Sequence, residues 1–382
     1  MTPAWLTKPT SAFHKVDRDA TFPLDHHATS WWRSSGFMLA VMLDKAGYSD
    51  DTQYRLLKFI RAITPILGNS HVSGTQHWKS FMTDDYTPIE VSWDWRVGDQ
   101  RPKIRFSIEP VGPHAGTILD PDNRYAAPML LGFMARALPN TQLKWLAHFQ
   151  RELCEADAMG SAEGHSSREF YAFDLEENDI VSKAYFFPGF KAQATGRSNY
   201  DIIADTIASA PGSSPEKLLA LKTLHEFIND TASPQLEMDM LAIDLVEPDD
   251  SRFKIYFRIR DVSFDSIRNT MTLGGRLHHQ SGMELGLQRL RQFYYDSLGR
   301  GAESPADSTS FLDCDHRTAG ILYNAEFKYG STHPRVKVYL PVRHYVESEE
   351  VIIHALDKHF RRTQSPKVAT MSQYRDAIYT SL

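Results

Sequence analysis

The stretch S-R-F-K-I-Y-F-R-I-R-D, from Ser251 to Asp261, sets the pattern by which the rest of the chain can be understood. Apolar residues at 253, 255, 257 and 259 alternate with polar or charged ones, the period of two that gives a β-strand one apolar and one polar face. Arg252 and Lys254 stand side by side on the polar face. Such cations repel each other unless an anion lies between them or water screens them. The sequence therefore predicts a β-strand and indicates an anion near the cations of its polar face.

Composition narrows the class of protein. A chain of 382 residues allows two or three domains or one large one. The net charge of −6 and the pI near 6.2 argue against a nucleic-acid partner, which usually requires a basic surface. Met1 to Phe22 contains no apolar run long enough for a signal peptide or membrane span, so we expect a cytoplasmic protein without a membrane partner. Cys154 and Cys314 lie far apart, which favours a reducing compartment.

The order helix, helix, strand, strand recurs four times. In the first copy a helix from Thr29 ends at Gly47, and Ser49 caps a second helix. In the third copy Ser214 is predicted to cap a helix that has Pro215 at its first position. The predicted strands are, in order, 89–95, 103–109, 170–175, 182–187, 241–246, 251–261, 321–328 and 335–342.

Cations recur on the second strand of each copy, at Arg105, Lys183, Lys254 and Lys337, about 70–85 residues apart. Three copies read Lys-x-Tyr, which adds Tyr185, Tyr256 and Tyr339 to the same faces. If the apolar faces pack on helices and the sheet closes, the cations line the lumen of a barrel. Each strand taken singly also fits an antiparallel sheet with a solvated face.

The residues of this face suit a specific chemistry. A lumen lined by cations would bind a polyanion such as diphosphate, and tyrosine rings can face a transient carbocation. The sequence contains no Asp-Asp-x-x-Asp motif for Mg²⁺-bound diphosphate, no Gly-rich phosphate loop and no His-Glu-x-x-His motif. We therefore expect no metal ligands and no cofactor.

Several strings in the chain resemble the fungal tryptophan dimethylallyltransferase family of aromatic prenyltransferases. They are T-D-D-Y-T-P-I-E-V-S-W-D-W, R-F-S-I-E-P, K-A-Y-F-F-P, S-R-F-K-I-Y, T-L-G-G-R-L and K-V-Y-L-P-V, in that order. The resemblance implies an α+β ABBA fold, in which antiparallel strands with a polar lumen are surrounded by helices. It implies one prenyltransferase domain over residues 1–382 and transfer of a dimethylallyl group from dimethylallyl diphosphate to an indole-type acceptor without a metal. The resemblance also implies small-molecule substrates and permits a homodimer.

The resemblance also implies residue roles. Glu90 would accept a hydrogen bond from an indole N–H and act in catalysis, and Phe81 and Met82 would seat the aromatic acceptor. The prenyl diphosphate would be bound and shielded by Arg105, Lys183, Tyr185, Arg252, Lys254, Tyr256, Lys337 and Tyr339.

Two features depart from the family. A lysine proposed as the final proton acceptor in tryptophan-using members falls near Phe170, which leaves that proton transfer unassigned. A fifth strand pair would be due after Lys337, where the sequence instead predicts helices from Ser348 and around Met371. A C-terminal truncation, an open edge and closure on eight strands all fit this pattern. The alternative function is therefore an inactive ligand-binding barrel that lacks the closing strands.

Overall fold

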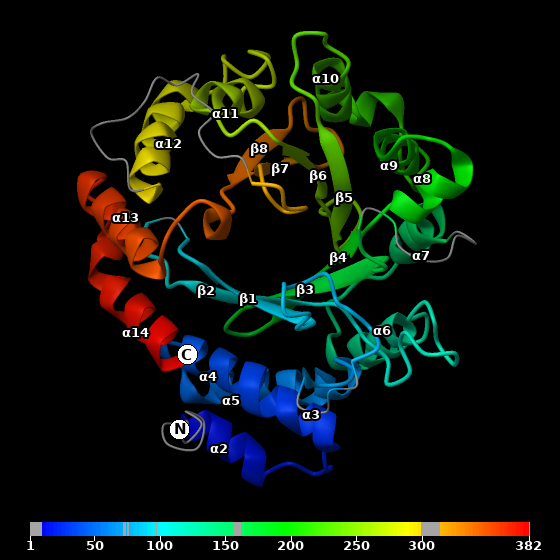
Figure 1. Ribbon diagram of the computed structural model, residues 1–382, viewed down its shortest axis with the longest axis vertical. Coiled ribbons are helices and arrows are strands. Elements are labelled where there is room, and N and C mark those ends of the chain that lie inside the picture. The colour runs from blue at the N-terminus through cyan, green and yellow to red at the C-terminus, as the bar shows by residue number, and fades with distance from the viewer. Residues whose placement is uncertain are drawn as a thin grey trace. The chain divides into compact units, whose positions relative to one another are not determined.

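The computed structural model describes residues 10–71, 74, 76–96, 98–155, 162, 164–298 and 314–381 (Figure 1). The chain divides into two compact units, each with its own strands and helices. The first unit comprises Met1–Leu143, Ala158–Tyr185 and Pro366–Leu382, and the second comprises Lys144–Asp157 and Phe186–Ser365. Whether the chain forms one domain, as the sequence predicts, stays a prediction.

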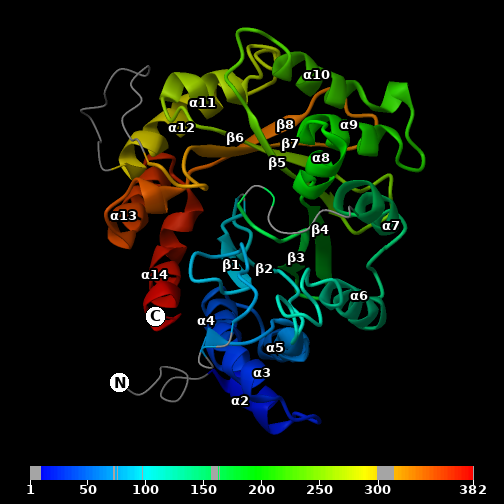
Figure 2. The same ribbon diagram turned by 45° about the vertical axis from the view of Figure 1, so that its right-hand side comes forward.

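The first unit is built on strands that follow one another in chain order. The strands are β1 (Ile89–Asp94), β2 (Lys103–Ile108), β3 (Glu169–Leu175) and β4 (Ile180–Phe186). The helices are α2 (Ser11–Arg18), α3 (His26–Trp31), α4 (Phe37–Lys45), α5 (Asp50–Ile63), α6 (Ala126–Ala137) and α14 (Met371–Ser381), with a π-helical turn at Trp32–Gly36. Helices α4 and α5 lie beside these strands (Figure 1 and Figure 2). The apolar face of the strands thus packs on helices, as Phe59 of α5 packs on Phe106 and Phe173.

The second unit repeats this arrangement. Its strands, again in chain order, are β5 (Glu237–Asp244), β6 (Phe253–Ile259), β7 (Ile321–Phe327) and β8 (Arg335–Tyr339), and all three pairings are antiparallel. Its helices are α7 (Leu146–Phe149), continued by a π-helical turn at Gln150–Cys154, α8 (Gly189–Thr195), α9 (Asn199–Ala208), α10 (Leu219–Ile228), α11 (Phe264–Met271), α12 (Met283–Ser297) and α13 (Glu349–Arg362). β6 confirms the strand predicted in residues 251–261, but its polar residues Lys254 and Arg258 are buried like Phe253 and Phe257, so burial does not distinguish its two faces.

Several predicted boundaries are confirmed by cap geometry. Gly47 follows α4 with φ +78°, and the Ser49 side chain accepts the Thr52 N–H at the start of α5. Ser214 is the N-cap residue with Pro215 at the first position, as predicted, but the turn Pro215–Lys217 is a 3₁₀ helix, the Ser214 side chain makes no cap hydrogen bond, and α10 begins only at Leu219. Proline at the first position suits either kind of turn, so it could not distinguish them.

After β8 the described residues up to 381 form helices and turns and contain no further strand. No helix in the described ranges is long and apolar enough to cross a bilayer.

Candidate active site

Each of the four strand pairs carries an ion pair between a carboxylate on its first strand and a cation on its second. The pairs and their N···O distances are Asp94–Arg105 at 2.7 Å, Asp174–Lys183 at 2.5 Å, Asp244–Lys254 at 2.5 Å and Glu326–Lys337 at 2.8 Å. In the pairs β1–β2, β5–β6 and β7–β8, the carboxylate lies diagonally across from its cation on the same face. Asp244, for example, lies diagonally across from Lys254, which is directly opposite Ala242. The anions that lie beside these cations are therefore carboxylates of the protein itself.

In the second unit these pairs join into one cluster. Arg252 bridges the two carboxylates, with Nε 2.6 Å from Asp244 Oδ2 and Nη1 3.4 Å from Glu326 Oε2. Burial alone would raise the pKa of both carboxyls, but Lys254 and Arg252 hold the pKa of Asp244 below its ordinary value, and Lys337 and Arg252 do the same for Glu326. Both side chains are therefore carboxylates at neutral pH.

The cluster of the second unit has three cations and two carboxylates, and its cations differ in exposure. The Lys254 side chain is 5% exposed, whereas those of Arg252 and Lys337 are 35% and 44% exposed. Tyr256 and Tyr339 lie on the same strand face with ring centroids 6.0 Å apart, and Asn324 Nδ2 donates to Tyr339 Oη at 2.9 Å. This face thus combines surplus positive charge with two aromatic rings.

The first unit has a related cluster around Asp174. Lys183 Nζ and Arg105 Nε lie 2.5 Å and 3.0 Å from Asp174 Oδ1, and Lys103 also pairs with Glu176. Burial would raise the pKa of Asp174, but Lys183 and Arg105 outweigh it and hold the pKa below its ordinary value. The Arg105 side chain is 35% exposed and Lys183 is buried. As in the second unit, a buried lysine and a more exposed arginine share one carboxylate.

Tyr185 follows Lys183 by two residues on β4. Its ring stacks on Phe170 with centroids 4.2 Å apart, and Phe170 in turn contacts Phe81 at 5.1 Å. Phe81 also contacts the ring of His165 at 5.3 Å. Phe170, at the position where the family lysine was expected, is therefore part of a row of aromatic rings that includes Phe81, one of the two predicted acceptor-seat residues.

Glu90 lies on β1 opposite Ser107 of β2. Its side chain is accessible to solvent, yet the protein around it desolvates the carboxyl and raises its pKa. Within the described residues it makes no hydrogen bond or ion pair. A carboxylate in this state can accept a proton or a hydrogen bond from a ligand, which suits the role that the resemblance implies.

Sequence reasoning missed a second carboxylate of this kind. Asp239 occupies the β-bulge in β5, where the register shifts between Met238 and Met240. Burial raises its pKa, with Arg258 and Arg317 acting in the opposite direction, and among described residues it forms no ion pair. Because a bulge breaks the period of two, the alternation that found the other residues could not place this side chain.

The structure thus groups Arg252, Lys254 and Lys337 with the two tyrosines in one unit, and groups Arg105 with Lys183 in the other. It joins Phe81 to Tyr185 through Phe170. The carboxylates that orient the cations were not predicted, although each precedes its cation by about ten residues, for example Asp174 by 9 and Glu326 by 11. Across the described ranges, no group of three His, Cys, Asp or Glu side chains is placed to hold a metal.

Comparison with known proteins places the chain among the prenyltransferases. The chain is 35% identical over 353 residues to the 4-O-dimethylallyl-L-tyrosine synthase of Claviceps purpurea, covering 89% of this chain and 78% of the relative. It is 32% identical over 370 residues to the 7-dimethylallyltryptophan synthase of Aspergillus fumigatus, covering 90% and 76%.

Solved structures agree on the fold. NotF prenyltransferase superposes with a TM-score of 0.81 at 24% identity, covering 98% of this chain and 90% of NotF. AnaPT from Neosartorya fischeri gives 0.80 at 23% identity, covering 96% and 88%. The predicted α+β ABBA fold is confirmed. The family model for tryptophan dimethylallyltransferase matches residues 27–376. The chain therefore belongs to the tryptophan dimethylallyltransferase family and is a prenyltransferase.

Proposed function

We propose that this protein transfers a dimethylallyl group from dimethylallyl diphosphate to an indole-type acceptor, such as a tryptophan derivative or a cyclic dipeptide. The observation that carries the proposal is the repeated arrangement of cations held by carboxylates on the tyrosine-bearing strand faces. A relative of this fold was crystallised as NotF in complex with brevianamide F and DMSPP, so at least one such protein takes up a prenyl diphosphate analogue.

The first step breaks the allylic C–O bond, and the electron pair leaves with the diphosphate. The cations stabilise the charge that develops on the leaving group, and because they are already held in place, little reorganisation is required. In this proposal the partly exposed Arg105, Arg252 and Lys337 donate to the diphosphate directly. The buried Lys183 and Lys254 keep the field positive beneath it.

The remaining allylic cation must be kept from water and presented to a nucleophile. The rings of Tyr185, Tyr256 and Tyr339 would shield it, since an aromatic face attracts a cation. The acceptor ring would lie against Phe81 and Met82 and attack the cation, forming the new C–C bond. Glu90 would accept the hydrogen bond of the indole N–H and so stabilise the positive ring intermediate before its ring proton leaves. Metal independence is part of the proposal.

A phenol is the second candidate acceptor. The relative that is 35% identical to this chain is, by name, a 4-O-dimethylallyl-L-tyrosine synthase. Attack through a phenol oxygen leaves no ring proton to remove, and the O–H proton can pass to Glu90. With a phenol as acceptor, the last proton transfer would therefore not require the family lysine, whose expected position is occupied by Phe170.

The working form proposed is a single domain in the cytoplasm that acts on small molecules, with no nucleic-acid or membrane partner and with a homodimer as a permitted assembly.

The test is incubation of the purified protein with dimethylallyl diphosphate and a panel of L-tryptophan, L-tyrosine, cyclic dipeptides and simple phenols, followed by mass spectrometry. A product heavier by one dimethylallyl group on an indole supports the proposal, and one on tyrosine alone selects the phenol. Binding of DMSPP by calorimetry without any product would favour the inactive ligand-binding barrel, and absence of both would refute the assignment of the diphosphate residues.

A further inference from the structure

Glu109 is a buried carboxylate whose role the proposed mechanism leaves open. It lies directly after β2 and is 2% exposed. It forms no ion pair within the described residues. A buried charge without a cation is costly unless hydrogen bonds compensate for it. The hydrogen-bond donors around Glu109 therefore indicate its role.

Three of these donors come from one short segment before β1, while the Ser167 hydroxyl, just before β3, also acts on the carboxylate. Trp78 Nε1 donates to Glu109 Oε1 at 2.9 Å, and Ser80 Oγ donates to Glu109 Oε2 at 2.6 Å. The backbone N–H of Phe81 also acts on the carboxylate and opposes the rise of its pKa that burial causes. Glu109 thus holds residues 78, 80 and 81 of the segment that leads to the predicted acceptor seat.

The network extends to the second residue of that seat. The Met82 N–H donates to Ser80 Oγ at 3.3 Å, and the same hydroxyl donates its own proton to Glu109. Glu109 therefore holds the backbone of Phe81 directly and that of Met82 through one hydroxyl.

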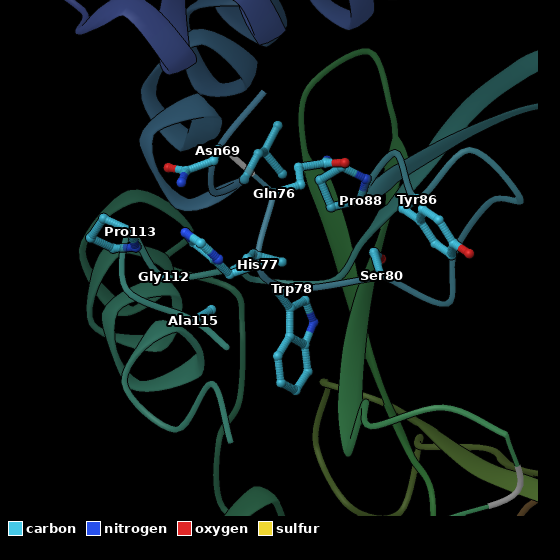
Figure 3. A pocket seen from close by; sticks show the side chains of 12 residues that line it. Asn69, Gln76, His77, Trp78, Ser80, Tyr86, Pro88, Gly112, Pro113 and Ala115 are labelled. Atoms are coloured by element: carbon cyan, nitrogen blue, oxygen red, sulfur yellow. The ribbon is translucent and has the colours of Figure 1, made fainter. Parts of the chain in front are cut away.

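The segment is also held from behind. Trp78 forms a small buried cluster with Val111 and Ala115. Figure 3 shows Trp78 and Ser80 on one segment that lines the pocket, and Pro113 and Ala115 on another. Gly116 has φ +75°, and a Cβ there would lie 2.4 Å from the carbonyl oxygen of His77. With the backbone fixed on that side, the hydrogen bonds of Glu109 set the position of the next residues.

We propose that Glu109 is a positioning residue for the aromatic acceptor: through Trp78, Ser80 and Phe81 it holds the Phe81–Met82 backbone where the acceptor ring binds. This inference rests on the proposed function, because it takes Phe81 and Met82 as the acceptor seat. It predicts that Glu109 affects the acceptor and leaves the prenyl diphosphate unaffected, because none of the residues proposed to bind the diphosphate belongs to the segment 78–82.

The test compares Glu109→Gln and Ser80→Ala with a matched control, Ser167→Ala. Gln keeps the shape but replaces one acceptor oxygen by a donor, and Ser80→Ala removes only the link to Met82. Ser167 is fully buried beside Glu109, and its hydroxyl opposes the raised pKa of Glu109 from a position outside residues 78–82. The control therefore measures the cost of losing a buried hydroxyl next to Glu109.

Two measurements are made on each variant: amide hydrogen exchange of the peptide covering 78–82, and KM for acceptor and for dimethylallyl diphosphate. For Glu109→Gln we expect faster exchange in that peptide and an acceptor KM raised about tenfold or more, with the diphosphate KM within about twofold. Ser80→Ala should show a smaller effect in the same direction, and Ser167→Ala should match the parent. Unchanged exchange, or equal changes in both KM values, would overturn the role of Glu109.

The two proposals fail in different ways. A parent protein that binds DMSPP but prenylates no acceptor contradicts the proposed function, whatever the variants do. An active parent whose Glu109→Gln and Ser80→Ala variants keep the parental acceptor KM contradicts the positioning role alone. If Glu109→Gln does not fold, Ser80→Ala still decides, because it leaves the buried carboxylate and its bond to Trp78 in place.

Discussion

Lys254→Met separates the structural from the ligand-binding role of the buried lysine. In the parent, Lys254 Nζ lies 2.5 Å from Asp244 Oδ1, and both side chains are 5% exposed. Methionine has nearly the same volume as lysine. Asp244 loses the ammonium of Lys254 but keeps Arg252, at 2.6 Å, as a charged partner. Breaking a buried ion pair by removing one partner costs about 3–5 kcal/mol. Because Arg252 remains, we expect the free energy of unfolding to fall by about 3 kcal/mol, which lowers the Tm by about 4 °C for a chain of this length.

The same variant should weaken diphosphate binding. Removing the ammonium takes one unit charge from beneath the diphosphate. At an effective dielectric constant of about 20, two unit charges about 8 Å apart interact by about 2 kcal/mol, so the Kd for DMSPP should rise about 30-fold. Binding of the aromatic acceptor to the free protein should change less than about twofold, because Lys254 lies on the diphosphate face. Isothermal titration calorimetry with each ligand measures both constants.

The double variant Asp244→Asn/Lys254→Met distinguishes the two effects. It replaces the ion pair by a neutral pair of similar shape, so no uncompensated carboxylate stays buried and most of the lost Tm should return. The affinity for DMSPP should stay low, because the ammonium is still missing. If DMSPP affinity recovers together with the Tm, Lys254 acts only through the stability of the strand pair and our assignment is refuted.

Three further outcomes follow. Desolvation by the surrounding protein raises the pKa of Glu90, so kcat should begin to fall with decreasing pH above the range of an ordinary glutamate. Glu90→Gln should lower kcat about 100-fold and abolish this acidic limb of the pH profile, and parental kcat in the variant would show that the base lies elsewhere. Turnover should stay within about twofold in excess EDTA, and a complete loss restored by Mg²⁺ would show that the diphosphate is neutralised by a metal. Burial also raises the pKa of Asp239, so its negative charge lowers the stability of the protein at neutral pH. Asp239→Asn should therefore leave the Tm equal or higher while turnover drops, and parental turnover in this variant would show that Asp239 does not belong to the site.

The strand faces could be predicted from the sequence because face is a local property. The alternation in residues 251–261 follows from backbone geometry alone, and the Lys-x-Tyr strings at Lys183, Lys254 and Lys337 repeat it at similar spacing. The structure confirms the strands there, within a few residues at each end. The roles of Glu90, Phe81 and Met82 had no such local basis and came from the resemblance to a family.

What only the tertiary structure decided is which side chains meet. Asp244 faces Lys254 because the register sets Ala242 opposite Lys254, and register depends on the turn and on packing rather than on periodicity. Phe170 reached Tyr185 and Phe81 in the same way, from neighbouring segments. The sequence determined that a polar, cation-bearing strand face exists, since that needs only a period of two. That each of its cations is held by a carboxylate of the preceding strand was decided by the pairing of the strands, because the diagonal contacts that hold them exist only once the register is set.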